Sequence, residues 1–199
     1  MCGVNSLKRN WENELKKFSY LPCRIIGQHI TRTGKITTKS IPDRVKELSQ
    51  PLDEFFIIMN IESFRSEEIF KAINNGPNKY GLIALDEAHK CKEPSSAQAK
   101  YFLKTKSPYK IAATGTLLLN SPLDAYMALK WIDIENSTYS NFKYYYCDYG
   151  GPFNNLLMGY KNTEFLKDQI DKVSLRRTKD ILDLPPKTII EEYVELDEK

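Results

Sequence analysis

No apolar stretch in this sequence reaches the ~18 residues that a membrane-spanning helix needs, so we expect a soluble protein with no membrane partner. Any repeat with a period of roughly 20 to 50 residues is also missing, which excludes a solenoid. The sequence also lacks a large excess of either sign of charge, because it has 29 Lys and Arg residues and 26 Asp and Glu residues, for a net charge of +3. This small charge permits nucleic-acid binding without arguing for it. With 41% hydrophobic and 28% charged residues among 199, the composition is that of one globular domain.

Cysteine is scarce and widely spaced. The four cysteines, Cys2, Cys23, Cys91 and Cys147, form no CxxC pair, and no secretory leader opens the sequence. This spacing argues against a disulfide framework or a zinc ribbon. His89 lies two positions before Cys91, but no further zinc ligand lies nearby, so we expect no zinc site there. Reduced thiols predict a cytoplasmic protein.

Short apolar runs alternate with amphipathic stretches along the chain. The runs are too short for helices and do not alternate with polar residues, which is typical of strands buried on both faces of a parallel sheet. The apolar runs cover residues 55–59, 81–85 and 110–113, and the stretches with helical spacing cover residues 7–18, 64–73, 95–103 and 123–132. This order predicts an α/β fold with a mainly parallel sheet.

Further segments flank this pattern. Residues 2–4 are interpreted as the end of another strand, residues 23–38 as a strand or hairpin, and residues 163–173 as a helix. Residues 137–159 are rich in tyrosine and predict a small insertion beside the sheet. Core packing is the favoured role of its aromatic side chains, and a platform that stacks on bases is the alternative.

Two adjacent carboxylates, Asp86 and Glu87, follow the apolar run 81–85. Neighbouring side chains at the end of a strand point in different directions, so the two acids can take two roles. In a nucleotide hydrolase the first holds Mg²⁺, which prefers carboxylate and water oxygens, and the second orients or deprotonates the attacking water. The alternative is that both acids are merely polar residues that end a strand.

A second polar turn, Thr114-Gly115-Thr116, follows the next apolar run. The carboxyl ends of neighbouring parallel strands are where α/β folds place ligands, so we expect this turn to lie beside the acidic pair. His89 and Thr114 should then be close enough to share a hydrogen bond. An ordinary Thr-Gly turn is the alternative.

Taken together, the sequence resembles the Swi/Snf-type DNA-dependent ATPases, a branch of the superfamily-two helicases. The segment 2–17 is similar to the family motif "SL..NW..E..K", residues 86–92 resemble the DEAH box with its basic extension, and residues 114–120 resemble "TGTP..N". Near the end, residues 175–179 and 184–187 match "LRR.K" and "LPPK". The overall residue pattern is most similar to bacteriophage and bacterial members of the family. This similarity implies that the protein is located in the cytoplasm of a bacterium or of a phage-infected host.

The resemblance implies a fold and a chemistry. The fold is a three-layer RecA-like lobe, the cofactors are ATP and Mg²⁺, and the partner is DNA, bound through its backbone without reading sequence. Asp86 would hold the metal, Asp86, Glu87 and His89 would face the nucleotide, and Glu87 would be the catalytic base. The turn 114–116 would couple nucleotide state to DNA, so Thr114, Gly115 and Thr116 are the predicted coupling residues.

The family's P-loop, GxxxxGK[ST], is not found in these 199 residues. Gly34-Lys35 does not supply it, because Ile36 follows and the preceding Gly27 is seven positions back where the motif requires five. We therefore expect most of a first RecA-like lobe, with the P-loop and the second lobe absent and with no ATPase activity of its own. Three segments are predicted: lobe 1 without its P-loop (1–136), an insertion (137–174), and the end of the lobe with a linker toward lobe 2 (175–199).

Predicted DNA contacts lie at strand ends and in the basic extension. They are Asn5, Ser6, Asn60 and Lys92. The helix dipole would assist the first two, and helix capping is the alternative for Asn5, Ser6 and Asn60. The basic residues 176–179 are either a solvated face or a brace between the two lobes.

Two functions remain open from sequence alone. The favoured one is an ATP-dependent translocase that moves along duplex DNA, and the alternative is a non-catalytic module that binds DNA or a protein through the same surface. A P-loop upstream in the gene would separate them. The sequence carries no signal for an oligomeric state.

Overall fold

The computed structural model describes residues 2–3, 7–118 and 120–177. The chain divides into two compact units, residues 1–163 and 164–199. The first unit contains a five-stranded sheet and two hairpins, and the second contains nearly all of the helix α7. The predicted boundaries at residues 137 and 175 remain predictions. No helix in the described ranges combines the length and the apolar character that a membrane crossing requires.

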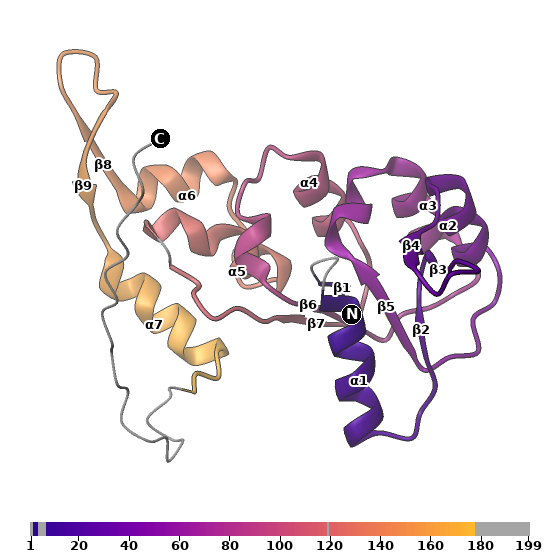
Figure 1. Ribbon diagram of the computed structural model, residues 1–199. Helices are drawn as coiled ribbons and strands as arrows, with labels where there is room; N and C mark the ends of the chain where they lie inside the picture. Colours follow the sequence, from indigo (N-terminus) through magenta and orange to yellow (C-terminus); the bar gives the residue numbers. More distant parts are fainter. Residues whose placement is uncertain (1, 4–6, 119, 178–199) are drawn as a thin grey trace, which may run out of the picture. The chain divides into compact units, whose positions relative to one another are not determined.

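A parallel five-stranded sheet organises the first unit (Figure 1). Its strand order is β2-β5-β1-β6-β7, and every pair is parallel. In Figure 1, α1 lies below the strands while α2, α3 and α4 lie above them, so helices cover the sheet from two sides. The predicted α/β class with a mainly parallel sheet is confirmed. The strands of this sheet are β1 (Cys2–Gly3), β2 (Cys23–Ile25), β5 (Phe56–Asn60), β6 (Leu82–Leu85) and β7 (Tyr109–Ala112).

Ser or Thr begins four of the helices. Ser40, Ser66, Ser96 and Thr138 each accept a hydrogen bond from the backbone N–H three residues later, which satisfies a donor that the helix cannot pair itself. The cap at Ser66 explains why the helix predicted over 64–73 begins at Glu67, after a 3₁₀ turn. The α-helices are α1 (Lys8–Phe18), α2 (Ile41–Leu48), α3 (Glu67–Asn75), α4 (Ala97–Leu103), α5 (Tyr126–Trp131), α6 (Tyr139–Tyr146) and α7 (Thr163–Val173), and the 3₁₀ turns are η2 (Ile61–Arg65), η3 (Ala88–Cys91) and η4 (Pro122–Ala125).

One buried cluster joins the sheet to its covering helices. It contains Leu48 of α2, Ile69 of α3, Phe102 of α4 and Trp131 of α5 together with strand residues such as Ile83. The rings of Phe102 and Trp131 are 4.0 Å apart between centroids. Burial of this apolar surface is the main contribution to the stability of the unit.

The segment predicted as a strand or hairpin contains both. Cys23–Ile25 joins the main sheet as its edge strand β2, and β3 (Gln28–Ile30) pairs antiparallel with β4 (Ile36–Thr38). Gly34 lies in the turn between β3 and β4 with φ +77°. A P-loop connects a strand to a helix, so the local structure also shows that Gly34-Lys35 is not one.

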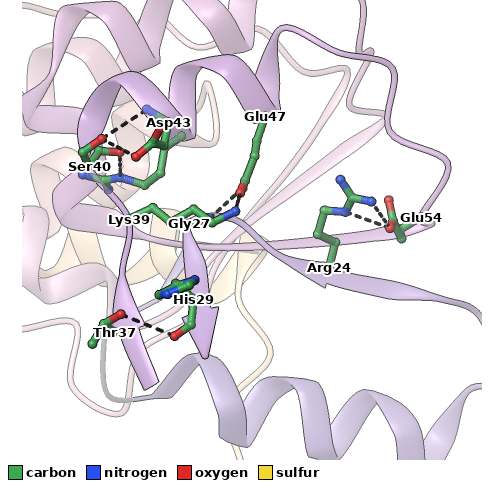
Figure 2. Close-up of polar contacts among 10 residues, drawn as sticks. Arg24, Gly27, His29, Thr37, Lys39, Ser40, Asp43, Glu47 and Glu54 are labelled. Atoms are coloured by element: carbon green, nitrogen blue, oxygen red, sulfur yellow. Dashed lines mark hydrogen bonds and ion pairs between the residues drawn. The ribbon is translucent and has the colours of Figure 1, made fainter. Parts of the chain in front are cut away.

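The helix α2, which was not expected from the sequence, anchors the β3-β4 hairpin. Glu47 of α2 accepts a hydrogen bond from the Gly27 N–H at 2.8 Å and pairs with Lys39 just after β4 (Figure 2). Gly27 has φ +71°, and a Cβ at this position would collide with the side-chain carbons of Arg44. Glycine at 27 therefore lets the Arg44 side chain lie across the backbone.

The tyrosine-rich insertion forms α6 and a second hairpin, β8 (Cys147–Gly150) with β9 (Leu156–Tyr160). Phe142 and Tyr146 are buried, and the ring of Phe142 is 5.1 Å from that of Tyr126. Tyr144 and Tyr145 are exposed. Some of these aromatic side chains thus pack in a core, as favoured from the sequence, while others face solvent.

Candidate functional site

The register of the sheet brings the predicted site residues to one edge. Leu85 at the end of β6 pairs with Ala112 of β7 and with Cys2 of β1, and Asn60 at the end of β5 pairs with Gly3. These strands therefore end side by side. The polar segments that follow β6 and β7 leave the sheet at neighbouring points, as predicted from the two turns.

Glu87 has a left-handed backbone, with φ 54° and ψ 48°. This conformation is unfavourable for a residue with a Cβ and requires the surroundings to hold it. Three hydrogen bonds do so, one from a backbone N–H to a side chain and two between backbone groups: Glu87 N–H to Asp86 Oδ1 (2.9 Å), Ala88 N–H to Ala113 O (2.9 Å) and Lys90 N–H to Glu87 O (2.9 Å). The strain fixes a sharp turn from β6 into η3, and non-glycine residues in this region cluster at functional sites.

The two carboxylates have different partners. Asp86 Oδ2 accepts a hydrogen bond from the indole Nε1 of Trp11 at 2.8 Å, whereas Glu87 Oε2 lies 3.2 Å from His89 Nδ1. Both acids are half-buried. Adjacent acids with separate surroundings can take separate roles, which agrees with the sequence-based expectation.

His89 connects the two strand ends. Its Nδ1 is 3.0 Å from Thr114 Oγ1 as well as 3.2 Å from Glu87 Oε2. The Thr114 hydroxyl donates to Thr116 O at 3.1 Å and accepts from Thr116 N–H at 3.2 Å. The bond to Thr116 O uses the single hydrogen of the hydroxyl, so Thr114 can only accept a hydrogen bond from His89. The network therefore favours the tautomer of His89 with the proton on Nδ1.

Thr116 takes part in the turn 114–116 through its backbone groups. Thr116 contacts Thr114 through its N–H and carbonyl, and both Gly115 and Thr116 are exposed. A Cβ at Gly115 would meet open space. Of the three predicted coupling residues, Thr114 is therefore the one whose side chain joins the acidic segment.

A second connection between the two segments involves Lys92, a predicted DNA contact. Its Nζ lies 3.2 Å from Asp124 Oδ1, and the Asp124 side chain is only 10% exposed. Asp124 Oδ2 also accepts hydrogen bonds from the N–H groups of Asn120 (2.8 Å) and Ser121 (3.3 Å). Burial by itself would raise the pKa of Asp124, but these hydrogen bonds and Lys92 together lower it below its ordinary value.

Asp124→Asn is expected to lower the free energy of unfolding by about 1 to 2 kcal/mol at pH 7, because charge-assisted hydrogen bonds are lost at a helical N-terminus. The folded-state pKa is depressed, so this stabilisation is present above the unfolded pKa near ~3.9 and disappears as the pH falls through the folded value. Urea unfolding at pH 7 measures the loss of stability in the variant, and urea unfolding at pH 3 measures how much smaller that loss becomes. The exposed Asp53→Asn is the control, and an undiminished difference at pH 3 would contradict the explanation.

Asn60, another predicted DNA contact, lies in a chain of hydrogen bonds that begins on α2. Arg44 donates to Ser63 Oγ at 2.7 Å, Ser63 donates to Asn60 Oδ1 at 2.6 Å, and Asn60 Nδ2 donates to Glu62 Oε2 at 3.2 Å. The amide of Asn60 is thus used within the chain. Asn5 and Ser6 lie outside the described residues.

Lys8 lies near this chain of hydrogen bonds. Its side chain is buried, with 8% exposure of the residue. Burial and the positive charge of Arg44 lower the pKa of Lys8, while Glu62 opposes them. The positive charges of Lys8 and Arg44 therefore adjoin the turn that follows Asn60, the last residue of β5.

A bound magnesium ion fits this edge of the sheet through Asp86. Among the described residues, each oxygen of Asp86 accepts one hydrogen bond, which leaves each oxygen a lone pair for a metal. In the described ranges no three His, Cys, Asp or Glu side chains are grouped closely enough to hold a metal by themselves. Mg²⁺ commonly binds one or two carboxylates together with water and substrate phosphates, and Asp86 matches that requirement.

Three contributors were not assigned a role from the sequence: Trp11, Arg44 and Asp124. Trp11 belongs to a motif quoted above, but its spacing does not indicate that it meets a residue 75 positions away. Arg44 lies on the helix that was not predicted. Asp124 has a signal, because Ser121 and Asp124 are spaced as a capping box.

Residues 2–199 match the protein-family model that is described as SNF2-related domain. A Mycoplasma genitalium protein, uncharacterized ATP-dependent helicase MG018, is 29% identical over 199 residues, 98% of this chain and 17% of that protein. DNA repair protein RAD5 of Debaryomyces hansenii is 27% identical over 128 residues, 60% of this chain and 10% of that protein.

Solved structures give a consistent comparison. The Sulfolobus solfataricus SWI2/SNF2 ATPase core in complex with dsDNA has a TM-score of 0.64 and 27% identity, covering 92% of this chain and 35% of that chain. A second structure of that ATPase core domain has a TM-score of 0.60 and 26% identity, with the same coverage. The chain thus spans a minor part of each of these relatives.

Proposed function

Because the chain belongs to the SNF2-related domain family, whose members are ATP-dependent helicase-like proteins, we propose that it is the first RecA-like lobe of an ATP-dependent translocase that moves along duplex DNA. The fold is that of the SWI2/SNF2 ATPase core. In this proposal the chain acts as part of an intact ATPase, meaning this chain joined to a P-loop segment and a second lobe. Residues 1–136, 137–174 and 175–199 are the lobe, its insertion and the linker.

The strained turn at Glu87 carries the proposal. It places a carboxylate within 3.2 Å of His89, which in turn lies 3.0 Å from Thr114 on the neighbouring strand end. A turn that only ended a strand would not need a left-handed glutamate held by three hydrogen bonds from backbone N–H groups. This arrangement supports the assignment of residues 86–89 as the DEAH box.

The proposed chemistry uses the two acids separately. Asp86 would hold Mg²⁺, which neutralises charge on the nucleotide phosphates when bound. Glu87 accepts a proton from the attacking water at its carboxylate, and His89 orients that carboxylate through Nδ1. Thr114 holds His89, so a shift of the turn 114–116 would reach Glu87.

The finer proposals concern DNA and cellular context. Asn5, Ser6, Asn60 and Lys92 are proposed to lie along the DNA backbone, although Asn60 and Lys92 would first have to exchange their present partners. The Mycoplasma relative matches 98% of the chain and the yeast and plant relatives 57 to 60%, which supports the predicted similarity to bacterial members. We propose a bacterial or phage-infected cytoplasm.

DNA-stimulated phosphate release by the intact ATPase tests this function. We expect hydrolysis to rise when duplex DNA is added and to require Mg²⁺. Binding of DNA without any hydrolysis would favour the alternative, a non-catalytic module on the same surface. The presence of a P-loop upstream in the gene is the simplest preliminary observation.

Thr114→Ala in the intact ATPase is expected to keep much of the ATP hydrolysis while lowering DNA movement per ATP consumed. The change removes the hydroxyl that bonds His89, while the carboxylates stay in place. Coupling between two sites typically amounts to about 1 to 3 kcal/mol, so we expect a loss of about 5- to 150-fold in coupling. Triplex displacement measures DNA movement and phosphate release measures ATP consumption, so the two assays together give the ratio of DNA movement to ATP hydrolysis.

Two further variants make this test specific. Thr114→Ser keeps the hydroxyl and should behave like the wild type. Thr37→Ala makes the same chemical change in the β3-β4 hairpin and should leave the ratio unchanged. Equal losses in both assays for Thr114→Ala, or no loss in either, would leave Thr114 as a turn residue only.

A further inference from the structure

Asp86 is held from two directions in the described part of the chain. The Glu87 N–H donates to Oδ1 at 2.9 Å, and the Trp11 indole N–H donates to Oδ2 at 2.8 Å. The first donor is the next residue, so it restrains Asp86 only within its own turn. The second comes from α1, and with both oxygens held the plane of the carboxylate is fixed.

The indole N–H of Trp11 is chemically suited to orienting the Asp86 carboxylate. An indole N–H donates and cannot accept, so it holds Asp86 as an acceptor. It is also neutral, so it orients the carboxylate without cancelling the negative charge that attracts a cation. A Lys or Arg at the same place would form a stronger contact but would repel Mg²⁺.

The surroundings of Trp11 give it a stable position. Trp11 is half-buried, and its helix α1 packs against β2 and β5 of the sheet. The donor is therefore attached to the sheet independently of the turn that carries Asp86. Resting on the function proposed above, we propose that Trp11 is a positioning residue, which sets the orientation of the Asp86 carboxylate for Mg²⁺.

The chain offers a matched control in its other tryptophan. Trp131 is 1% exposed, and its Nε1 has no hydrogen-bond partner within the described ranges. Replacing either tryptophan with phenylalanine removes the same atoms. Only at Trp11 does the replacement also remove a hydrogen bond to a carboxylate.

The test measures Mg²⁺-dependent binding of a fluorescent, non-hydrolysable ATP analogue to the intact ATPase. Trp11→Phe is expected to raise the Mg²⁺ concentration at half-maximal binding by about 10-fold or more, because loss of a partner that orients a metal ligand typically lowers metal affinity 10- to 100-fold. Trp131→Phe should stay within about twofold of the wild type. Binding measured in EDTA should be equal in all three proteins.

A second replacement guards against loss of folding. Benzothienylalanine has nearly the size of tryptophan but carries sulfur in place of the N–H. Introduced at both tryptophans, it removes the Trp11 hydrogen bond alone, since Trp131 Nε1 has no partner in the described residues. Thermal unfolding verifies that the protein is folded, and the Mg²⁺ shift should be reproduced.

The outcomes separate this proposal from the proposed function. Equal shifts in Trp11→Phe and Trp131→Phe, or no shift with benzothienylalanine, would show that Trp11 only packs, while the ATPase assignment would stand. A wild type that bound nucleotide with no dependence on Mg²⁺ would contradict both proposals.

Discussion

Replacing Glu87 with glutamine is expected to lower ATP turnover of the intact ATPase by about 10²- to 10⁴-fold, the usual contribution of a positioned general base. Glutamine has the same shape, and its carbonyl can still face His89 Nδ1, which lies 3.2 Å from the present carboxylate. The left-handed backbone at this position is no more strained with glutamine than with glutamate. Only the ability to accept a proton is lost, so nucleotide binding should survive while turnover falls.

Two measurements and two further variants make the result interpretable. Phosphate release gives turnover, and binding of a fluorescent ATP analogue shows whether the nucleotide site is intact. Glu93→Gln makes the same exchange at an exposed position of the adjacent segment and should keep wild-type turnover. Asp86→Ala should instead weaken Mg²⁺-dependent binding. Wild-type turnover in both Glu87→Gln and Asp86→Ala would mean that the acids merely end a strand.

The 199-residue chain by itself is expected to show no ATP hydrolysis, with or without duplex DNA. No segment within it can cradle the β and γ phosphates, because the P-loop motif is missing. The single Gly-Lys pair lies at the β3-β4 turn, between antiparallel strands rather than at the start of a helix. Asp86 and Glu87 would therefore have no bound nucleotide on which to act.

The measurement is phosphate release by the purified chain compared with a blank that lacks protein. The Glu87→Gln form of the same chain reveals any contaminating ATPase, since a contaminant would be unaffected by the substitution. Hydrolysis that exceeded the blank and disappeared in Glu87→Gln would overturn the prediction. Circular dichroism should confirm that the chain is folded before an absence of activity is accepted.

The main sheet was predictable because its strands are locally distinctive. The runs around residues 55–59, 81–85 and 110–113 correspond to β5, β6 and β7, each shifted by one residue at most at either end. The helix predicted over 163–173 is found at Thr163–Val173. Short apolar runs and amphipathic helices have patterns that depend on neighbouring residues alone. The expectation that these strands are buried on both faces is wrong for β7, at the edge of the sheet, where Tyr109 and Ile111 are exposed.

The helix α2 was missed, and β2 was predicted only as part of a segment interpreted as a strand or hairpin, because their local signals are weak or ambiguous. The helix α2 has eight residues, and its signals are Ser40, Pro42 and the spacing of Ile41, Val45 and Leu48. The strand β2 has three residues and joins the sheet through pairing with β5, 33 positions later at Cys23 and Phe56. Such short elements form because tertiary packing stabilises them, which a local pattern does not report.

The sequence by itself determined the α/β class, the succession of the main strands along the chain and the proximity of His89 and Thr114, because adjacent parallel strands must end at the same edge, whereas the order of the strands within the sheet came from the tertiary structure. Tertiary structure alone decided the left-handed turn at Glu87, the contact of Trp11 with Asp86 and the pairing of Lys92 with Asp124. These contacts join residues that are distant along the chain or hold a backbone conformation unfavourable in isolation. Their geometry therefore depends on how separate elements pack, and no spacing of residue types encodes it.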